Sequence, residues 1–250
     1  MPTFWLVSGN KGGVGKSATV IGLTSRLIRN CGIQSVGIID GDGRTPDIFR
    51  MCNRKIMARQ LDFRLLKPES TLSMVEGDYE RVLHGYMRAA ASHIVINTPD
   101  GADQQLLSWF DSTLRHIEPY GTSRDVSFKF LFVMSPVPDG LEFLPQIAQR
   151  FDRLFPVRNL YFGSEEKFTD FNSLYAPAFK RVVDFPRLGA GEMEKMKRLS
   201  LLPHEYINSR DASKRIHLLN KQRVMNWDSD VDEELFDVIE GDESNLIMAE

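Results

Sequence analysis

Short apolar runs alternate with amphipathic segments from the start of the chain. The apolar runs have β-forming residues and cover 3–8, 35–39, 93–97 and 127–135, with weaker examples at 159–162 and 181–185. Helical spacing of apolar residues marks 17–30, 79–91, 103–117, 141–155, 191–199 and 211–227. Apolar strands alternating with helices predict an α/β fold, in which helices cover both faces of a mostly parallel sheet.

Composition narrows the class of protein without naming a ligand. The chain has 250 residues, 42% of them hydrophobic, and a net charge of −3. That length suits one domain with a sizeable core, and the charge gives no general argument for nucleic acid or membrane. Cys31 and Cys52 are too few for a disulfide framework. No apolar run approaches the ~18 residues that a membrane span needs, and the first strand leaves no room for a signal peptide. We therefore expect a cytoplasmic protein.

The most specific motif lies between the first strand and the first helix, where residues 9–17 read Gly-Asn-Lys-Gly-Gly-Val-Gly-Lys-Ser. Such a turn directs successive backbone N–H groups into one concavity, and the helix that follows adds its positive dipole end. Lys16 is expected to reach the β- and γ-phosphates, and the Ser17 hydroxyl to bind Mg²⁺. The residues expected to bind the nucleotide are Asn10, Lys11, Gly12, Gly13, Val14, Gly15, Lys16, Ser17 and Ala18.

Polar side chains follow the next two strands and are candidates for the metal site. Asp40 and Asp42 end the strand at 35–39, and Asn97 ends the strand at 93–97. We expect Asp42 to face the phosphates and Asp40 to lie nearer the outer shell of the metal. Asn97 stands where a P-loop NTPase normally has an aspartate; its amide oxygen can accept a hydrogen bond from a metal-bound water but brings no charge. The predicted Mg²⁺ residues are thus Ser17, Asp40, Asp42 and Asn97.

Lys11 is not needed to bind phosphate within one subunit. A second lysine at the start of the loop can instead reach the nucleotide of a facing subunit, as an arginine finger does. ATP would then hold a dimer together.

These segments resemble the ParA/MinD group of ATPases. Residues 11–17 match its deviant Walker A loop, and residues 40–47 resemble its Asp-x-Asp switch I segment. Residues 97–101, Asn-Thr-Pro-Asp-Gly, resemble its switch II sequence Asp-Thr-Pro-Ala-Gly, with departures at Asn97 and Asp100. The similarity is specific over roughly the first hundred residues.

The resemblance implies a single-domain P-loop NTPase that binds Mg²⁺ and ATP and forms an ATP-dependent homodimer. It implies catalytic roles for Lys11 across the interface, for Lys16 in its own subunit and for Asp42 near the attacking water. It also implies weak hydrolysis that a partner protein stimulates. Members of the group position or segregate cargo such as plasmids, and some serve conjugative transfer.

Charge in the last third of the chain divides at residue 227. Residues 187–223 contain nine Lys or Arg, whereas residues 228–250 contain ten Asp or Glu and no Lys or Arg. We expect an ATPase domain at 1–227 and an acidic tail or helix at 228–250, which anionic lipid would repel. Non-specific DNA binding is expected from a basic surface made of Lys195, Lys197, Arg198, Lys214, Arg215, Lys221 and Arg223.

Two other functions fit parts of the sequence. One is a metabolic P-loop enzyme that transfers phosphate to a small acceptor, which Lys11 argues against. The other is a non-hydrolysing ATP-binding regulator, which Asn97 favours. The Asn-Lys-x-Asp segment typical of guanine selection is missing after the strand near 162, where Gly163-Ser164-Glu165-Glu166 follows, so ATP is favoured over GTP.

Overall fold

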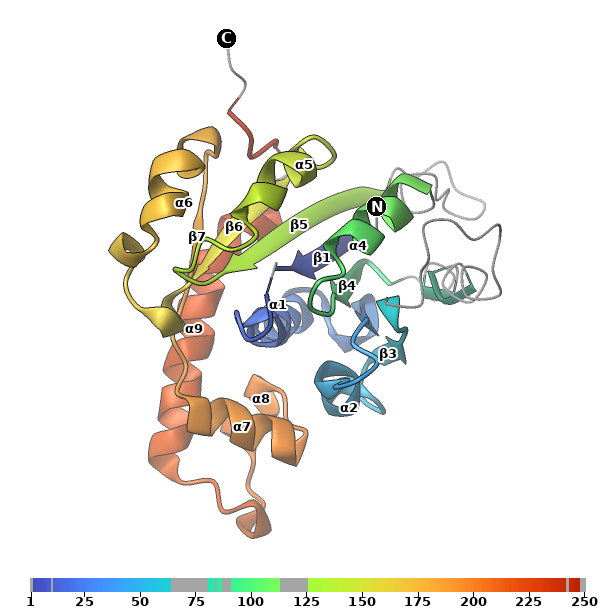
Figure 1. Cartoon of the computed structure of the whole chain (residues 1–250). Coiled ribbons are helices and arrows are strands. Elements are labelled where there is room, and N and C mark those ends of the chain that lie inside the picture. Colours follow the sequence, from blue (N-terminus) through green and yellow to red (C-terminus); the bar gives the residue numbers. More distant parts are fainter. Residues whose placement is uncertain are drawn as a thin grey trace.

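The computed structural model of the protein describes residues 2–9, 11–63, 81–83, 85–86, 91–112, 126–241 and 243–247 (Figure 1). Its strands are β1 (Thr3–Ser8), β2 (Val36–Asp40), β3 (Met57–Gln60), β4 (His93–Asn97), β5 (Ser127–Met134), β6 (Leu154–Asn159) and β7 (Val183–Phe185). Its helices are α1 (Lys16–Cys31), α2 (Asp47–Cys52), α4 (Asp103–Ser112), α5 (Leu144–Ala148), α6 (Thr169–Leu174), α7 (Ala190–Leu199), α8 (Pro203–Asn208) and α9 (Leu218–Glu240).

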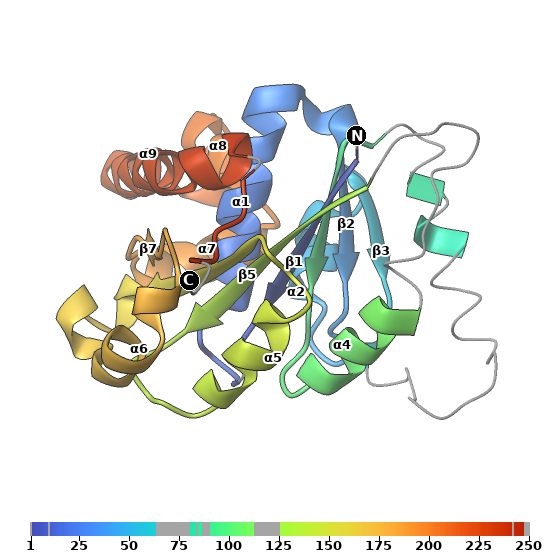
Figure 2. The ribbon, with the colours of Figure 1, turned by 90° about the horizontal axis from the view of Figure 1, so that it is seen from above.

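The seven strands form one parallel sheet in the order β3-β2-β4-β1-β5-β6-β7. Helices cover both faces, with α1, α8 and α9 on one side and α4, α5 and α6 on the other (Figure 2). The predicted α/β class and parallel sheet are confirmed. All the carboxyl ends of the strands therefore meet at one edge, and the register sets Asn97 beside both Val7 and Asp40 there.

Alternation along the central strands explains why both faces are covered. Trp5 and Val7 of β1 belong to the apolar cluster under α1 and α9, whereas Phe4 and Leu6 belong to the cluster under α4 and α5. Successive side chains of a strand point to opposite faces, so a strand that is apolar at every position is stable only between two layers.

Two expected elements are wrong in the middle of the chain. The helix expected at 141–155 is a short 3₁₀ turn followed by α5, which ends at Ala148. The strand expected at 159–162 lies earlier, as β6 (Leu154–Asn159), and Leu160–Phe162 forms a 3₁₀ turn. Phe151, Leu154 and Phe155 continue the helical spacing of α5, but the last two belong to a strand whose first four positions are all apolar and buried. The expected helix at 79–91 and the end of the one at 103–117 lie largely outside the described residues.

The edge strand β3 has no counterpart among the expected elements, because its sequence is short and half polar. Among the described residues, no helix is both long enough and apolar enough to span a membrane.

The acidic segment after residue 227 continues a helix that begins in the basic segment. Helix α9 runs without a break through the expected boundary, and its apolar positions Val231, Leu235 and Val238 are buried. Its acidic side chains contact α1, where Arg29 forms ion pairs with Asp228 and Asp232. Ion pairs between α1 and α9 therefore hold the acidic part of α9 against α1, which packs on the sheet.

A buried lysine fixes the end of α9. Lys129 on β5 is 2% exposed, and its Nζ donates to the carbonyl oxygens of Val238, Ile239 and Gly241 at 2.8, 2.9 and 2.6 Å. The last carbonyls of a helix have no partner within it and carry the negative end of its dipole. The ammonium group satisfies them and also lies 5.1 Å from the ring centre of Trp5.

Candidate functional site

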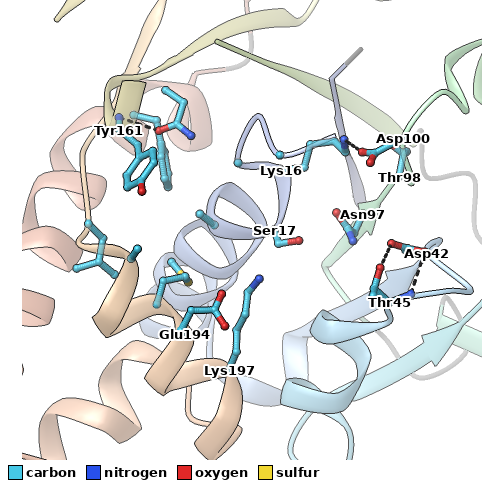
Figure 3. A pocket seen from close by; sticks show the side chains of 18 of the residues that line it. Lys16, Ser17, Asp42, Thr45, Asn97, Thr98, Asp100, Tyr161, Glu194 and Lys197 are labelled. Atoms are coloured by element: carbon cyan, nitrogen blue, oxygen red, sulfur yellow. Dashed lines mark hydrogen bonds and ion pairs between the residues drawn. The ribbon is translucent and has the colours of Figure 1, made fainter. Parts of the chain in front are cut away.

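A cavity of about 390 Å³ opens at the carboxyl edge of the sheet (Figure 3). Its floor is the glycine loop between β1 and α1, and its walls come from the ends of β2, β4, β6 and β7 together with α7 and α9. Ligands bind at this edge in open α/β sheets, because the loops there are free of the sheet's hydrogen bonding. The structure thus gathers polar groups from distant parts of the sequence in one place.

The glycine loop has the backbone conformation that its sequence predicts. Gly13 and Gly15 have φ values of +80° and +104°, which side chains disfavour. Asn159, at the end of β6, supports the loop by donating from Nδ2 to the carbonyl of Val14 at 2.7 Å. A Cβ atom at Gly15 would lie 2.0 Å from that Nδ2, so the loop and Asn159 fit together only with glycine there. Asn10, also expected to bind nucleotide, lies outside the described residues.

Lys16 lies within the loop and is 7% exposed. Its Nζ donates to the carbonyl oxygens of Lys11 at 3.0 Å and Gly9 at 3.4 Å, and it forms an ion pair with Asp100. Ser17 also lines the cavity, at the first turn of α1. Both side chains are therefore placed at the positive end of a helix, where an anion is stabilised.

Asp40 is the last residue of β2, whereas Asp42 lies in the turn that follows the strand, and the two carboxylates have different surroundings. Asp42 lines the cavity, and its carboxylate accepts from the N–H groups of Arg44 and Thr45 at 2.9 and 3.1 Å and from the Thr45 hydroxyl at 2.7 Å. This turn holds the carboxylate at the cavity wall (Figure 3).

Asp40 is fully buried and lies outside the cavity lining. Its carboxylate accepts from Phe49 N and Asn97 Nδ2, both at 2.9 Å, and from Asp42 N at 3.3 Å. Burial raises the pKa of Asp40, and these hydrogen bonds oppose that rise. Asp40 thus links the ends of β2 and β4, which border the cavity.

Asn97 supplies an acceptor to the cavity. Its Nδ2 is held by Asp40, while its Oδ1 is buried and has no hydrogen-bond partner in the described part of the chain. An unpaired buried oxygen costs free energy, which a water or a hydrated cation would recover. Residues 2–9, 11–63 and the other described ranges contain no group of three His, Cys, Asp or Glu that could hold a metal alone. A Mg²⁺ ion bound mainly by phosphates and water fits the Ser17 hydroxyl, Asp42 and the Asn97 Oδ1.

Lys11 points away from the cavity formed by its own loop. Its Nζ lies 2.9 Å from Oδ2 of Asp139 in the segment after β5, and the two side chains are 51% and 64% exposed. Lys11 is not part of the cavity lining. An exposed pair of this kind is worth about 0–1 kcal/mol, so another anion can replace Asp139 at little cost.

The far end of the cavity has an apolar wall, which the sequence did not reveal. Its lining residues are Tyr161 from the 3₁₀ turn after β6, Phe185 from β7, Pro186 and Leu188 from the segment after β7, and Trp227 from α9. Trp227 donates from Nε1 to the Pro186 carbonyl at 3.0 Å and meets Phe185 edge to face, with ring centres 5.9 Å apart. Flat apolar surfaces with a few polar groups suit the base of a nucleotide.

The seven residues predicted to bind DNA do not share one environment. Lys197 lines the cavity and its Nζ lies 3.3 Å from Oδ2 of Asp47. Four others contact the protein itself: Lys195 and Lys221 donate to backbone carbonyls, Arg223 pairs with Glu192 at 2.8 Å, and Lys214 lies 3.9 Å from Asp211. The exposed side chains are those of Arg198, Arg215 and Arg223. Any DNA surface on this face would rest mainly on these three arginines.

A solved structure shares this fold. A candidate plasmid partition protein from Borrelia burgdorferi B31 bound to AMPPNP aligns over 90% of this chain and 99% of its own, with 14% identity and a TM-score of 0.56. A nucleotide-binding protein from Archaeoglobus fulgidus in complex with ADP aligns over 80% of this chain and 86% of its own, with 17% identity and a TM-score of 0.46.

No protein-family model and no curated protein matches the sequence. The likeness to the plasmid partition protein therefore concerns the fold, which is a single parallel sheet flanked by helices.

Proposed function

We propose that the protein is a Mg²⁺- and ATP-dependent ATPase switch of the ParA/MinD type. The observation that carries the proposal is one continuous cavity that has the glycine loop, with Lys16 and Ser17, at its polar end and the wall of Tyr161 and Trp227 at its apolar end. A nucleotide needs these two surfaces in this order, because its phosphates bind loop N–H groups and its base prefers an apolar wall. A protein of known structure that is bound to AMPPNP aligns with the chain, which supports this reading.

The residues would divide the work as follows. Lys16 and the N–H groups of the loop bind the phosphates and stabilise charge that develops during hydrolysis. Ser17, Asn97 and Asp42 hold a hydrated Mg²⁺, which neutralises charge on the β- and γ-phosphates when it is bound. Asp42 also borders the position of an attacking water and can orient it, since both of its oxygens already accept hydrogen bonds that fix their direction.

The dimer is part of the proposal. Lys11 is held outside its own cavity by a weak exposed pair, which is compatible with a role at the nucleotide of a second copy. Slow hydrolysis, stimulated by a partner protein, would then reset an ATP-dependent homodimer. The cargo would be DNA, in plasmid partition or conjugative transfer, with Arg198, Arg215 and Arg223 available for phosphate contacts.

Equilibrium binding and light scattering test the proposal. Calorimetry should detect Mg²⁺–AMPPNP binding to the wild type and its loss in Lys16→Ala. Light scattering should find a dimer with AMPPNP but not with ADP, and Lys11→Ala should remain a monomer with both. The matched control is Lys180→Ala, which removes an exposed lysine remote from the cavity. A wild type that binds neither nucleotide would overturn the proposal, and a mass that nucleotide never changes would remove its dimer.

One observation favours a second candidate, a regulator that binds ATP without hydrolysing it. Asn97 brings no charge to the position next to the metal, and Asp40 is turned away from the cavity. Phosphate release that stays at the level of buffer alone, in a protein that dimerises with ATP, would favour this regulator over the ATPase.

A further inference from the structure

The carboxylate of Asp100 lies against the start of the glycine loop. Its Oδ1 forms an ion pair with Lys16, and a Cβ atom added at Gly12 would lie 2.6 Å from its Oδ2. The side chain of Lys16 is 8% exposed and that of Asp100 is 58% exposed. The Asp100 carboxylate, in the segment after β4, therefore reaches from the surface to the ammonium group of Lys16.

This ion pair completes the hydrogen bonding of Lys16. An ammonium group has three donors, and those of Lys16 have the carbonyls of Gly9 and Lys11 and the carboxylate of Asp100 as acceptors. The two carbonyls belong to the glycine loop, and moving them would change the loop conformation that directs its N–H groups towards the phosphates. A phosphate oxygen can therefore reach Lys16 most easily by replacing Asp100.

The position of Asp100 decides which phosphate it meets. Figure 3 shows Tyr161 and Asp100 on opposite sides of Lys16, with Ser17 below and between them. A nucleotide whose base rests on the wall at Tyr161 extends its phosphates past Ser17 towards Lys16, so its last phosphate comes nearest to Asp100. ATP has a third phosphate to place there, and ADP ends one phosphate earlier.

We propose that Asp100 is a specificity-determining residue that lowers the affinity for nucleoside triphosphate relative to diphosphate. The inference rests on the proposed function, since it assumes that the cavity binds an adenine nucleotide. A γ-phosphate must either displace the carboxylate from Lys16 or lie beside it as a like charge. Displacing the carboxylate and placing two like charges side by side both weaken triphosphate binding. A diphosphate, which ends one phosphate earlier, is weakened less.

Calorimetry with AMPPNP and with ADP, each in excess Mg²⁺, tests this on the full chain. Asp100→Asn and Asp100→Ala should each bind AMPPNP about three- to tenfold more tightly than the wild type, the range expected for losing one partly exposed charge interaction. Their affinity for ADP should change less than about twofold on the same reasoning. Asp170→Asn, an exposed carboxylate on α6, controls for the change in net charge and should leave both affinities unchanged.

The outcomes separate this inference from the proposed function. Equal gains for both nucleotides would overturn the specificity role while leaving the ATP site intact. Weaker AMPPNP binding in Asp100→Asn would also overturn it, because Asp100 would then act as a ligand of the metal. Binding of neither nucleotide by the wild type or the variants would overturn both proposals together.

Discussion

Replacing Asn97 by aspartate would set two carboxylates against each other at the buried edge of the sheet. Aspartate is the usual residue at this position in P-loop NTPases, so the change tests what the amide does here. Asn97 donates from Nδ2 to Asp40 at 2.9 Å, and Asp40 is fully buried. The variant loses this donor and gains a charge at the same distance.

The size of the effect follows from the cheaper of two costs. Two unit charges 2.9 Å apart repel by about 6 kcal/mol at an effective dielectric constant of 20. Taking up one proton at pH 7, by a carboxyl with an unfolded pKa near 3.9, costs about 4 kcal/mol and restores a hydrogen bond. The pair should therefore share a proton, and Asn97→Asp should lower the free energy of unfolding by about 3–4 kcal/mol at pH 7.

The pH dependence provides the decisive sign. Because the pKa of the pair is raised in the folded state, the penalty is absent below the unfolded pKa and grows as pH rises. It should be about 1 kcal/mol at pH 5, after the same allowance for the restored hydrogen bond, and increase by about 1.4 kcal/mol per pH unit up to pH 7.

Urea unfolding in EDTA at pH 5 and pH 7 measures this penalty, with Asn208→Asp as the exposed control. Mg²⁺ with AMPPNP should recover part of the loss, because a cation offsets the second charge. A variant as stable as the wild type at pH 7 in EDTA would refute the reasoning.

Three further predictions concern the helices and the apolar wall. Lys129→Met should lower the free energy of unfolding by about 3 kcal/mol, because carbonyls at the end of α9 lose their donor; an unchanged urea midpoint would contradict this. Arg29→Met should cost about 2–3 kcal/mol at pH 7 by leaving the buried carboxylate of Asp228 without its cation. Burial already raises the pKa of Asp228, so this cost should shrink as pH falls towards 4, and a loss independent of pH would argue against the charge. Tyr161→Ala should weaken AMPPNP binding by calorimetry about tenfold, but leave inorganic triphosphate binding unchanged; equal losses would show that Tyr161 supports the loop instead.

The sequence predicts the parts of the fold in which local pattern and tertiary environment agree. The strand at 93–97 has the observed bounds, those of β2 differ by one residue at each end, and those of β5 differ by one residue at one end. The agreement is close because a strand buried on both faces is apolar at nearly every position. The glycine loop was equally clear, since its sequence, its conformation and the start of α1 are all local. Asp42 lines the cavity while Asp40 does not, because the chain leaves the strand after Asp40.

The rest of the site depends on which strands become neighbours. Tyr161, Phe185 and Trp227 form one wall only because β6 and β7 are adjacent and α9 crosses beside them, and no spacing along the chain encodes that. Asn159 acts on Val14 across 145 positions of sequence. In the sequence, Lys197 cannot be distinguished from the neighbouring basic residues that were expected to bind DNA. Only the packing of α7 against α2 turns its side chain towards Asp47.

The charges around the glycine loop form a balanced set. Lys11, Lys16 and the start of α1 bring positive charge to one turn of backbone, which is unfavourable without anions nearby. Asp139 and Asp100 supply them from the segments after β5 and β4, the two strands on either side of β1. Each lysine therefore has its own carboxylate, and the two pairs do not share a residue. In the proposed mechanism, ATP replaces Asp100 at Lys16, and a second copy of the protein replaces Asp139 at Lys11. Nucleotide binding and dimerisation then act on separate charges of one loop. Asp100→Asn should therefore strengthen AMPPNP binding even in a Lys11→Ala background that stays monomeric.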